Sequence, residues 1–247
     1  MKEQRFFYNP QPESGVLPAE EAQHATRVLR LGPGDEIYVM DGAGAFHTAL
    51  ITEASNHRCA YSITSSMHPA PEWSGRIHLA VAPTKSLDRL EWLTEKAMEI
   101  GIDRMSLLDC RNSERHVVKT ERLFKILVSA MKQSRKAWLP QLDAMEPFAS
   151  FVGRSDLPPC RFIAHCHDPR DVDPDGDGVL PFLGDVLRRG EDALVLVGPE
   201  GDFSVDEVRQ AASCGFVSVS LGSSRLRTET AALVATHLMR LSARNDV

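Results

Sequence analysis

Residues 195–233 read VLVGPEGDFSVDEVRQAASCGFVSVSLGSSRLRTETAAL, in which apolar runs alternate with glycine-containing loops and helix starts. The apolar run 193–197 is short and rich in β-branched residues, which is typical of a strand buried on both faces. A second strand is predicted at 216–221, and a glycine-containing loop follows each of the two strands. Each loop leads into a helix, so the stretch predicts an α/β fold with parallel strands.

Both helices of this stretch have recognisable starts. The first is predicted to follow Ser204, an N-cap residue whose capping box is completed by Glu207, and to run to about Cys214. The second is predicted from Ala231 to about Leu241. Because open α/β sheets bind ligands beyond the carboxyl ends of their strands, we expect a binding site where the two loops meet.

The loops carry no phosphate-binding fingerprint, since neither G-x-G-x-x-G after a strand nor G-x-x-x-x-G-K-[ST] occurs. Taken alone, the G-x-x-G of Gly198 and Gly201 fits a structural turn and a ligand loop equally well. Arg225, Arg227 and Glu229 gather beside the second loop and favour a ligand loop. A capped helix start with solvated charges is the alternative.

Length and composition set broad limits. The 247 residues are enough for one large domain or two small ones, and 43% hydrophobic and 25% charged residues are ordinary for a soluble globular protein. No apolar run approaches the roughly 18 residues of a membrane span, and the N-terminus lacks the apolar core of a signal peptide. We therefore expect a cytoplasmic protein with no membrane contact. Five scattered cysteines indicate reduced thiols rather than disulfides.

The charge is unevenly distributed along the chain. A net charge of −6 argues against a protein that coats nucleic acid indiscriminately. Residues 76–140 nevertheless carry 13 Lys and Arg against 8 Asp and Glu, whereas the flanking segments are acidic. Between Arg111 and Lys136 there are 8 basic and 2 acidic residues. A solvated helix face is the ordinary explanation of such a cluster.

Residues 1–70 are predicted to form a small, mainly β domain. Short strands separated by tight turns favour a small barrel, and they are expected at 5–8, 37–40, 45–51 and 59–63. A helix is expected after Pro18, with Ala22, Ala25, Val28 and Leu29 on its apolar face. The aromatic residues Phe6, Phe7 and Tyr8 fit either the core or a surface that stacks on bases, and the core is the favoured interpretation.

Residues 71–76 are predicted to be a linker, and residues 77–247 a second domain. Its first helix, 86–100, shows apolar residues at helical spacing and is ended by Gly101. The further expected elements are strands at 77–82, 105–108 and 161–166 and helices at 121–135 and 179–188.

Two motifs resemble a known family. G-P-E-G-D-F-S-x-D-E at 198–207 and L-G-x-S-R-L-R-T-E-T-A at 221–231 resemble the C-terminal signature of the RsmE family, which belongs to the SPOUT methyltransferases. The resemblance implies an rRNA (uracil-N3)-methyltransferase, which uses S-adenosylmethionine to methylate a uridine near the 3′ end of 16S rRNA in the small ribosomal subunit. It also implies a trefoil-knotted parallel sheet in the SPOUT domain, an N-terminal PUA-like β-barrel that binds RNA, and a homodimer.

By this resemblance the two glycine loops hold S-adenosylmethionine, and the end of the strand near 165 forms a wall of the pocket. The candidate cofactor contacts are His165, Gly198, Glu200, Gly201, Leu221, Gly222 and Leu226.

Candidate catalytic residues follow from the chemistry of the substrate. Uracil N3 is a weak acid that is protonated at neutral pH, so its methylation is helped by a base or by a cation near the developing anion. Arg227 is the candidate cation and Glu229 the candidate base, with Glu200 a less favoured base. Alternatively, either glutamate only orients Arg227 or caps the helix.

Candidate RNA contacts also rest on the resemblance. H-x-x-x-V-L-R-L-G-P-G-D at 24–35 resembles an early motif of the family, and 131–136 resembles its E-Q-S-x-R stretch. With these matches, an RNA-facing surface becomes the favoured explanation of the basic cluster. The candidate contacts are Arg5, Arg27, Arg30, Lys85, Gln133, Arg135 and Lys136.

The chain departs from the family pattern at four positions. Lys132 replaces an acidic residue and Lys136 an arginine, and lysine cannot reproduce a bidentate arginine contact. Ser224 stands where an arginine is usual, with Arg225 next to it. Asp202 stands where a second glycine is common.

Other functions are less well supported by the sequence. A metal site at His165 and His167 is not expected, because no distant cysteine pair completes a tetrahedral set. The alternatives to N3 methylation are another SPOUT RNA methyltransferase, acting on ribose 2′-OH, and a noncatalytic RNA-binding or assembly factor. An oxidoreductase that uses a dinucleotide is disfavoured, because the phosphate fingerprint is missing.

Overall fold

The structure, a computed structural model, describes residues 5–55 and 57–245. The chain divides into two compact units, one of residues 1–71 and 128–139 and the other of residues 72–127 and 140–247. Residues 128–139 therefore group with the N-terminal unit, whereas the predicted domain limits place them in the second domain. Within the described part of the chain, no helix is both long enough and apolar enough to cross a membrane.

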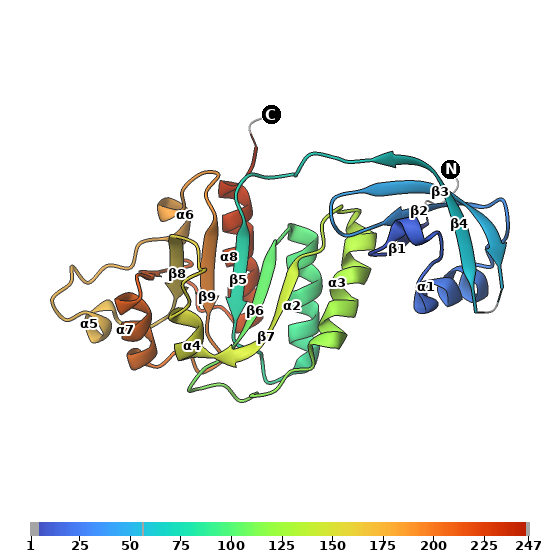
Figure 1. The fold of residues 1–247 in the computed structure, drawn as a ribbon. Coiled ribbons are helices and arrows are strands. Elements are labelled where there is room, and N and C mark those ends of the chain that lie inside the picture. The colour runs from blue at the N-terminus through green and yellow to red at the C-terminus, as the bar shows by residue number, and fades with distance from the viewer. Residues whose placement is uncertain (1–4, 56, 246–247) are drawn as a thin grey trace. The chain divides into compact units, whose positions relative to one another are not determined.

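The N-terminal unit contains a four-stranded sheet in the order β1-β2-β3-β4, in which β1 runs parallel to β2 and the other pairs are antiparallel (Figure 1). The strands are β1 (Phe6–Tyr8), β2 (Glu36–Met40), β3 (Phe46–Ala54) and β4 (Cys59–Met67), which confirms the four predicted strands. Phe7 is completely buried in the core, and Phe6 and Tyr8 are half-buried. Phe7 therefore belongs to the core, as the favoured interpretation held.

The predicted N-terminal helix is real but irregular. After η1 (Pro12–Ser14), α1 (Ala19–Gln23) continues into the π-helical turn η2 (His24–Val28), where the amide of Leu29 donates to the carbonyl of His24 at 3.0 Å. Ala22 and Ala25 are buried as predicted, but Val28 is 66% exposed, so its expected place on the apolar face is wrong. The wider turn explains this, because it rotates the residues after it away from the regular helical positions.

The second unit is built on six parallel strands in the order β10-β8-β9-β5-β6-β7 (Figure 1). The chain enters the middle of this sheet, builds outward to one edge through β6 and β7, and then forms β8, β9 and β10 on the other side. The connections that leave β5 and β9 therefore diverge, and such a switch point is where open α/β sheets bind ligands. The strands are β5 (Ile77–Val81), β6 (Arg104–Asp109), β7 (Gln141–Pro147), β8 (Cys160–Ala164), β9 (Ala193–Val197) and β10 (Val217–Val219).

Helices cover both faces of this sheet. On one face α8 (Thr228–Ser242) packs against α2 (Leu87–Ile100), α6 (Leu183–Val186), β5 and β9 (Figure 1). On the other face α7 (Val205–Ser213) packs with α4 (Phe148–Val152) and α5 (Pro169–Val172). Alternating side chains of β9 feed the two cores, since Val195 and Val197 face one and Leu194 and Leu196 the other. The helix α3 (Thr120–Ser134) contributes Leu123 to the first core.

Two parts of the second unit differ from the sequence prediction. The helix expected at 179–188 is wrong, because only α6 is helical there, and the chain before it is extended along β10. The amide of Ser220 donates to the Pro181 carbonyl at 2.8 Å, and the amide of Leu183 donates to the Ser220 carbonyl at 2.9 Å. The strand β7 and the short helices α4 and α5 were not predicted.

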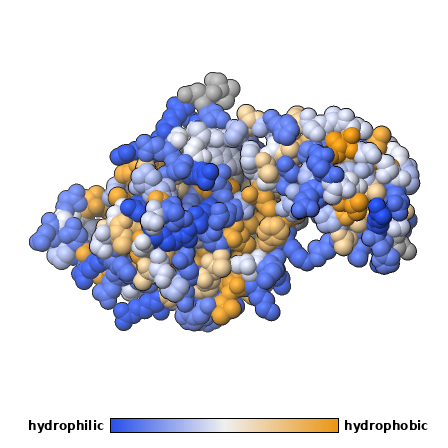
Figure 2. Space-filling model, viewed as in Figure 1, coloured by the Kyte–Doolittle hydropathy of each residue, from blue (hydrophilic) through white to orange (hydrophobic). Residues whose placement is uncertain are grey.

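The surface agrees with this distribution of apolar side chains. Figure 2 shows hydrophilic residues over much of the drawn face, with hydrophobic residues in separate groups. Most large apolar side chains are thus buried in the cores.

Candidate functional site

A cavity of about 1070 Å³ lies beyond the carboxyl ends of β8, β9 and β10. It is the site expected where the two glycine loops meet. Its lining comes from the segments 164–167, 197–202 and 220–228, together with three single residues from elsewhere in the same unit: Arg89, Leu180 and Ala231.

Glycine is required in both loops, for different reasons. A Cβ on Gly198 would lie 3.0 Å from the backbone nitrogen of Phe203 and 3.1 Å from its ring, so the loop closes tightly only without a side chain. Gly222 has φ +117° and open space around it, so its backbone conformation rather than packing excludes other residues. The hydroxyl of Ser220 holds this second loop, accepting from the Gly222 amide at 3.0 Å.

The loop after β9 is held by neighbouring loops. Glu200 accepts a hydrogen bond from the backbone amide of Lys85, in the loop after β5, at 2.9 Å. The side-chain amide of Asn112, in the loop after β6, donates to the carbonyl of Gly201 at 3.2 Å. Three of the candidate cofactor contacts, Gly198, Glu200 and Gly201, therefore lie on a supported loop.

His165 is a buried polar side chain that faces the cavity. It is 7% exposed, and neither ring nitrogen has a hydrogen-bond partner among the described residues. Burial lowers the pKa of His165, so its imidazole is neutral at physiological pH. A neutral imidazole offers one donor and one acceptor, and a ligand in the cavity can use both.

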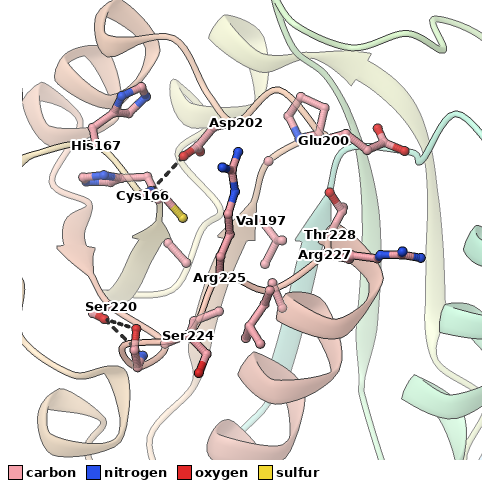
Figure 3. Close-up of a pocket in the computed structure, with 18 of the residues that line it drawn as sticks. Cys166, His167, Val197, Glu200, Asp202, Ser220, Ser224, Arg225, Arg227 and Thr228 are labelled. Atoms are coloured by element: carbon pink, nitrogen blue, oxygen red, sulfur yellow. Dashed lines mark hydrogen bonds between the residues drawn. The ribbon is translucent and has the colours of Figure 1, made fainter.

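Arg225 and Cys166 also line the cavity. Figure 3 shows the Arg225 side chain extending into it, toward Cys166 and Asp202, while Arg227 points away from Arg225. The Cys166 side chain is exposed. Burial and the charge of Asp202 raise the pKa of the Cys166 thiol, and Arg225 acts in the opposite direction.

The two candidate catalytic residues meet in a second, smaller hollow. Glu229 is 7% exposed in the first turn of α8, and its Oε2 has no hydrogen-bond partner among the described residues. Its Oε1 lies 3.7 Å from Nη1 of Arg89, on α2. The hollow has a volume of about 400 Å³ and is lined by Asp88, Arg89, Trp92, Arg227, Glu229 and Thr230.

Arg89 was missed by the sequence analysis. It lines both the cavity and the hollow, as Arg227 does, and its Nη1 lies 3.7 Å from Oε1 of Glu229. Nothing in the sequence connects Arg89 with a residue 140 positions further along the chain.

Metal ligation is not suggested by the geometry. The rings of His165 and His167 are 5.6 Å apart, and Nε2 of His167 donates to the carbonyl of Phe203 at 2.6 Å. No group of three or more His, Cys, Asp and Glu side chains within residues 5–55 and 57–245 is arranged to hold a metal ion.

Six of the seven candidate RNA contacts lie in the N-terminal unit, and Lys85 lies in the other. Arg135 has φ 55°, and its guanidinium lies 5.5 Å from the centre of the Phe6 ring. Lys132 forms an ion pair with Glu21, so its charge is partly compensated. In the second unit, the ammonium of Lys85 forms an ion pair with Glu114 at 3.0 Å, and Lys85 does not line the cavity.

The structure thus brings together all seven candidate cofactor residues around one cavity, and Arg227 and Glu229 around the adjoining hollow. The candidate RNA contacts are not part of either.

Comparison with known protein families identifies two matching regions. Residues 71–240 match the RNA methyltransferase domain, and residues 17–61 match the RNA methyltransferase PUA domain.

Similar proteins cover almost the whole chain. A structure described as a probable rRNA-methyltransferase from Porphyromonas gingivalis is 40% identical, with a TM-score of 0.86, and the match covers 97% of this chain and 98% of that one. The ribosomal RNA small subunit methyltransferase E of Neisseria gonorrhoeae, solved with bound S-adenosyl methionine, is 29% identical with a TM-score of 0.79 at the same coverage. The protein of that name in Rickettsia conorii is 26% identical over 246 residues, which is 98% of this chain and 96% of that protein.

Proposed function

The chain belongs to the RNA methyltransferase family, and on this basis we propose that it transfers the methyl group of S-adenosylmethionine to N3 of a uridine near the 3′ end of 16S rRNA in the small ribosomal subunit. Relatives named ribosomal RNA small subunit methyltransferase E support an rRNA substrate and this cofactor. The observation that carries the proposal is the cavity at the carboxyl ends of β8, β9 and β10, which all seven candidate cofactor residues line.

The residues around the cavity fit S-adenosylmethionine. A volume of about 1070 Å³ is sufficient for a nucleoside joined to an amino acid. The unpartnered ring nitrogens of His165 offer hydrogen bonds, and the loops at Gly198 and Gly222 bring backbone groups close without side chains. The cofactor supplies an electrophilic methyl group on a sulfonium, so the protein has to bind it, orient it and manage one proton of the base.

We propose that the residues of the adjoining hollow remove the proton from N3 of the uracil. Loss of the N3 proton makes the uracil ring anionic, and the guanidinium of Arg227, which borders both spaces, is placed to stabilise this charge. The unpartnered Oε2 of Glu229 is the acceptor for the proton. Arg89 lies 3.7 Å from the other oxygen and forms an ion pair with the carboxylate.

A second role for Glu229 makes a different prediction. If Glu229 only orients Arg227 and Arg89, glutamine retains most of that function, because an amide still accepts a hydrogen bond. If Glu229 is the base, glutamine cannot take the proton. The Glu229→Gln variant therefore separates the two roles.

We propose that RNA is bound through the arginines of the N-terminal unit. Arg27, Arg30 and Arg135 are exposed. Because the net charge of the chain is negative, RNA binding is expected to depend on individual arginines rather than on general electrostatic attraction. Arginine stacked on an aromatic ring, as Arg135 is on Phe6, is suited to contact a base face. Unstacking of the target uridine is expected to accompany binding.

We further propose that the protein acts as a homodimer in the cytoplasm. Trp92 on α2 and Leu241 on α8 are each 47% exposed, and large apolar side chains at the surface are suited to a contact between copies. Light scattering coupled to gel filtration tests this, and a mass that stays near 27.3 kDa at micromolar concentration contradicts it.

The experiment that tests the function is methyl transfer to small ribosomal subunits that lack the modification. Subunits are incubated with labelled S-adenosylmethionine and the protein, the 16S rRNA is digested, and the labelled nucleoside is identified by chromatography and mass spectrometry. We expect the label in N3-methyluridine, at one methyl group per subunit.

Other results have distinct meanings. Label in a 2′-O-methyl nucleoside contradicts the N3 assignment but keeps the methyltransferase. Absence of label in both subunits and free rRNA, with a folded protein, contradicts methylation and favours a noncatalytic RNA-binding factor.

A further inference from the structure

Asp202 has a backbone conformation that residues other than glycine rarely adopt. Its φ is 62°, in the left-handed region. Asparagine and aspartate tolerate this region better than other side chains, chiefly where the carboxylate or amide bonds to nearby backbone. The contacts of the Asp202 carboxylate are therefore informative.

Both carboxylate oxygens of Asp202 accept backbone hydrogen bonds. Oδ2 accepts from the amide of Cys166, beyond the end of β8, at 2.7 Å (Figure 3), and Oδ1 accepts from the amide of Phe203 at 2.7 Å. The first of these bonds joins two walls of the cavity that are 36 residues apart in sequence. Glycine at this position provides no such bond.

The backbone of Asp202 is held from another side. Its carbonyl accepts from the side-chain amide of Asn112, in the loop after β6, at 3.1 Å. Asp202 therefore joins the loop after β9 both to the loop after β6 and to the end of β8. His167 provides a second link to this loop, through the carbonyl of Phe203 at 2.6 Å.

We propose that Asp202 is a positioning residue that fastens the loop after β9 to the end of β8 and so keeps the cofactor cavity formed before the cofactor binds. The inference rests on the proposed function in one respect, namely that the ligand of the cavity is S-adenosylmethionine. A cavity that is already formed binds more tightly, because no binding energy is spent on ordering its walls.

The test compares two substitutions of Asp202. Asp202→Gly keeps the left-handed backbone and removes both side-chain bonds, whereas Asp202→Asn keeps an oxygen acceptor and removes the charge. Hydrogen exchange of the Cys166 amide is measured without cofactor. Dissociation constants for S-adenosylmethionine and S-adenosylhomocysteine are measured by calorimetry, the second ligand lacking the sulfonium charge.

We expect Asp202→Gly to expose the Cys166 amide to faster exchange and to weaken the binding of both ligands by about tenfold. Asp202→Asn is expected to remain within about threefold of the unsubstituted protein for both ligands, since the bond to Cys166 is kept. Equal losses for the two ligands are expected, because the fastening does not depend on the sulfonium charge.

Asp177→Gly serves as the matched control. Asp177 is exposed, does not line the cavity, and accepts a local backbone bond from Val179 at 2.9 Å. Its substitution removes the same charge and a similar bond, and both ligands are expected to bind as before.

The proposal is overturned if Asp202→Gly leaves either the exchange rate of the Cys166 amide or the affinity for the two ligands unchanged. It is also overturned if Asp202→Asn binds the ligands as weakly as Asp202→Gly, because this would indicate a role of the charge alone. If the unsubstituted protein binds neither ligand, the proposed function fails. The exchange of the Cys166 amide then still decides whether Asp202 fastens the loop.

Discussion

Glu229 is the most unusual single residue of the site. A carboxylate that is 7% exposed normally has all its oxygen atoms hydrogen-bonded, because burial of an unpartnered charge is unfavourable. Here Oε2 lacks a partner among the described residues, and the guanidinium of Arg89 lies 3.7 Å from the other oxygen. A position in the first turn of α8 offsets part of the cost through the helix dipole.

The base assignment predicts a selective loss in Glu229→Gln. Because proton transfer by a placed side chain contributes at least about a hundredfold, turnover is expected to fall by about that factor while S-adenosylmethionine affinity is unchanged. Single-turnover methylation and calorimetry measure the two quantities. Glu95→Gln, which removes a carboxylate of α2 that pairs with Lys96 outside both cavities, is expected to leave turnover intact. Wild-type turnover in Glu229→Gln refutes the base assignment.

His78 illustrates how the core sets the response to pH. Burial disfavours its charged form and Arg104 adds to this, so its pKa falls from 6.5 to about 3. Nε2 of His78 lies 2.8 Å from Oγ of Ser106, which donates to the carboxylate of Asp143. The imidazole is therefore the donor in the bond to Ser106.

The expected consequence is a loss of stability in acid. Between pH 6.5 and about 3 the unfolded chain binds a proton at His78 that the folded chain does not, so folding stability decreases as pH falls through this window. The slope is at most about 1.4 kcal/mol per pH unit. Urea unfolding at pH 7 and pH 5 is compared with His78→Gln, which keeps a donor and cannot titrate. Equal pH dependence in both proteins contradicts the prediction.

At the scale of elements, α7 is fixed by its capping box. The hydroxyl of Ser204 accepts from the Glu207 amide at 3.3 Å, and the Glu207 carboxylate accepts from the Ser204 amide at 2.8 Å. Glu207 also accepts from the amide of Arg111, in the loop after β6, at 2.8 Å. The same carboxylate therefore starts a helix and supports the loop that carries Asn112.

Ser204→Ala is expected to lower the free energy of unfolding by about 1 kcal/mol, because one amide of the first turn loses its acceptor. Ser213→Ala, at the other end of α7, removes a bond to the Gln210 carbonyl and is expected to cost less than about 0.5 kcal/mol. Urea unfolding of both variants gives the comparison, and equal losses contradict a specific role of the cap.

Elements were predictable where local signals agree. The strand β9 and the helix α7 have an uninterrupted apolar run, a glycine break and a capping box in succession, and the structure confirms both. The strand β7 lies at the sheet edge and is mostly half-buried, so it lacks the run that marks a central strand. The segment before α6 becomes extended through its pairing with Ser220, a long-range contact that no local pattern reports.

At the scale of the whole molecule, the cofactor cavity was predictable because motifs of the sequence occupy neighbouring loops. The adjoining hollow was not predictable as a whole, since the pairing of Arg89 with Glu229 depends on how α2 packs against α8. The path of a chain leaves no periodic pattern in its sequence, so the trefoil knot was inferred only from the resemblance. It stays a prediction.

RNA binding by placed arginines predicts a specific salt dependence. Each phosphate contact that is lost reduces the slope of log Kd against log salt concentration by about one. Arg27→Ala and Arg30→Ala are each expected to show this reduction with a 16S rRNA fragment in filter binding. Arg188→Ala removes an exposed arginine that pairs with Glu191 outside the candidate set, and its slope is expected to match the unsubstituted protein. Unchanged slopes in the first two variants contradict the proposed surface.

The cavity beyond β8, β9 and β10 is expected to hold the cofactor, and the reactivity of Cys166 reports directly on its occupancy. Cys166 is exposed and lines the cavity, Cys214 is half-buried and does not, and the other three thiols are buried. Alkylation of each thiol is followed by mass spectrometry at alkaline pH, because the pKa of Cys166 is raised. Saturating S-adenosylmethionine is predicted to slow alkylation of Cys166 by at least about tenfold and to leave Cys214 unchanged. Cofactor that binds by calorimetry without protecting Cys166 would contradict the claim.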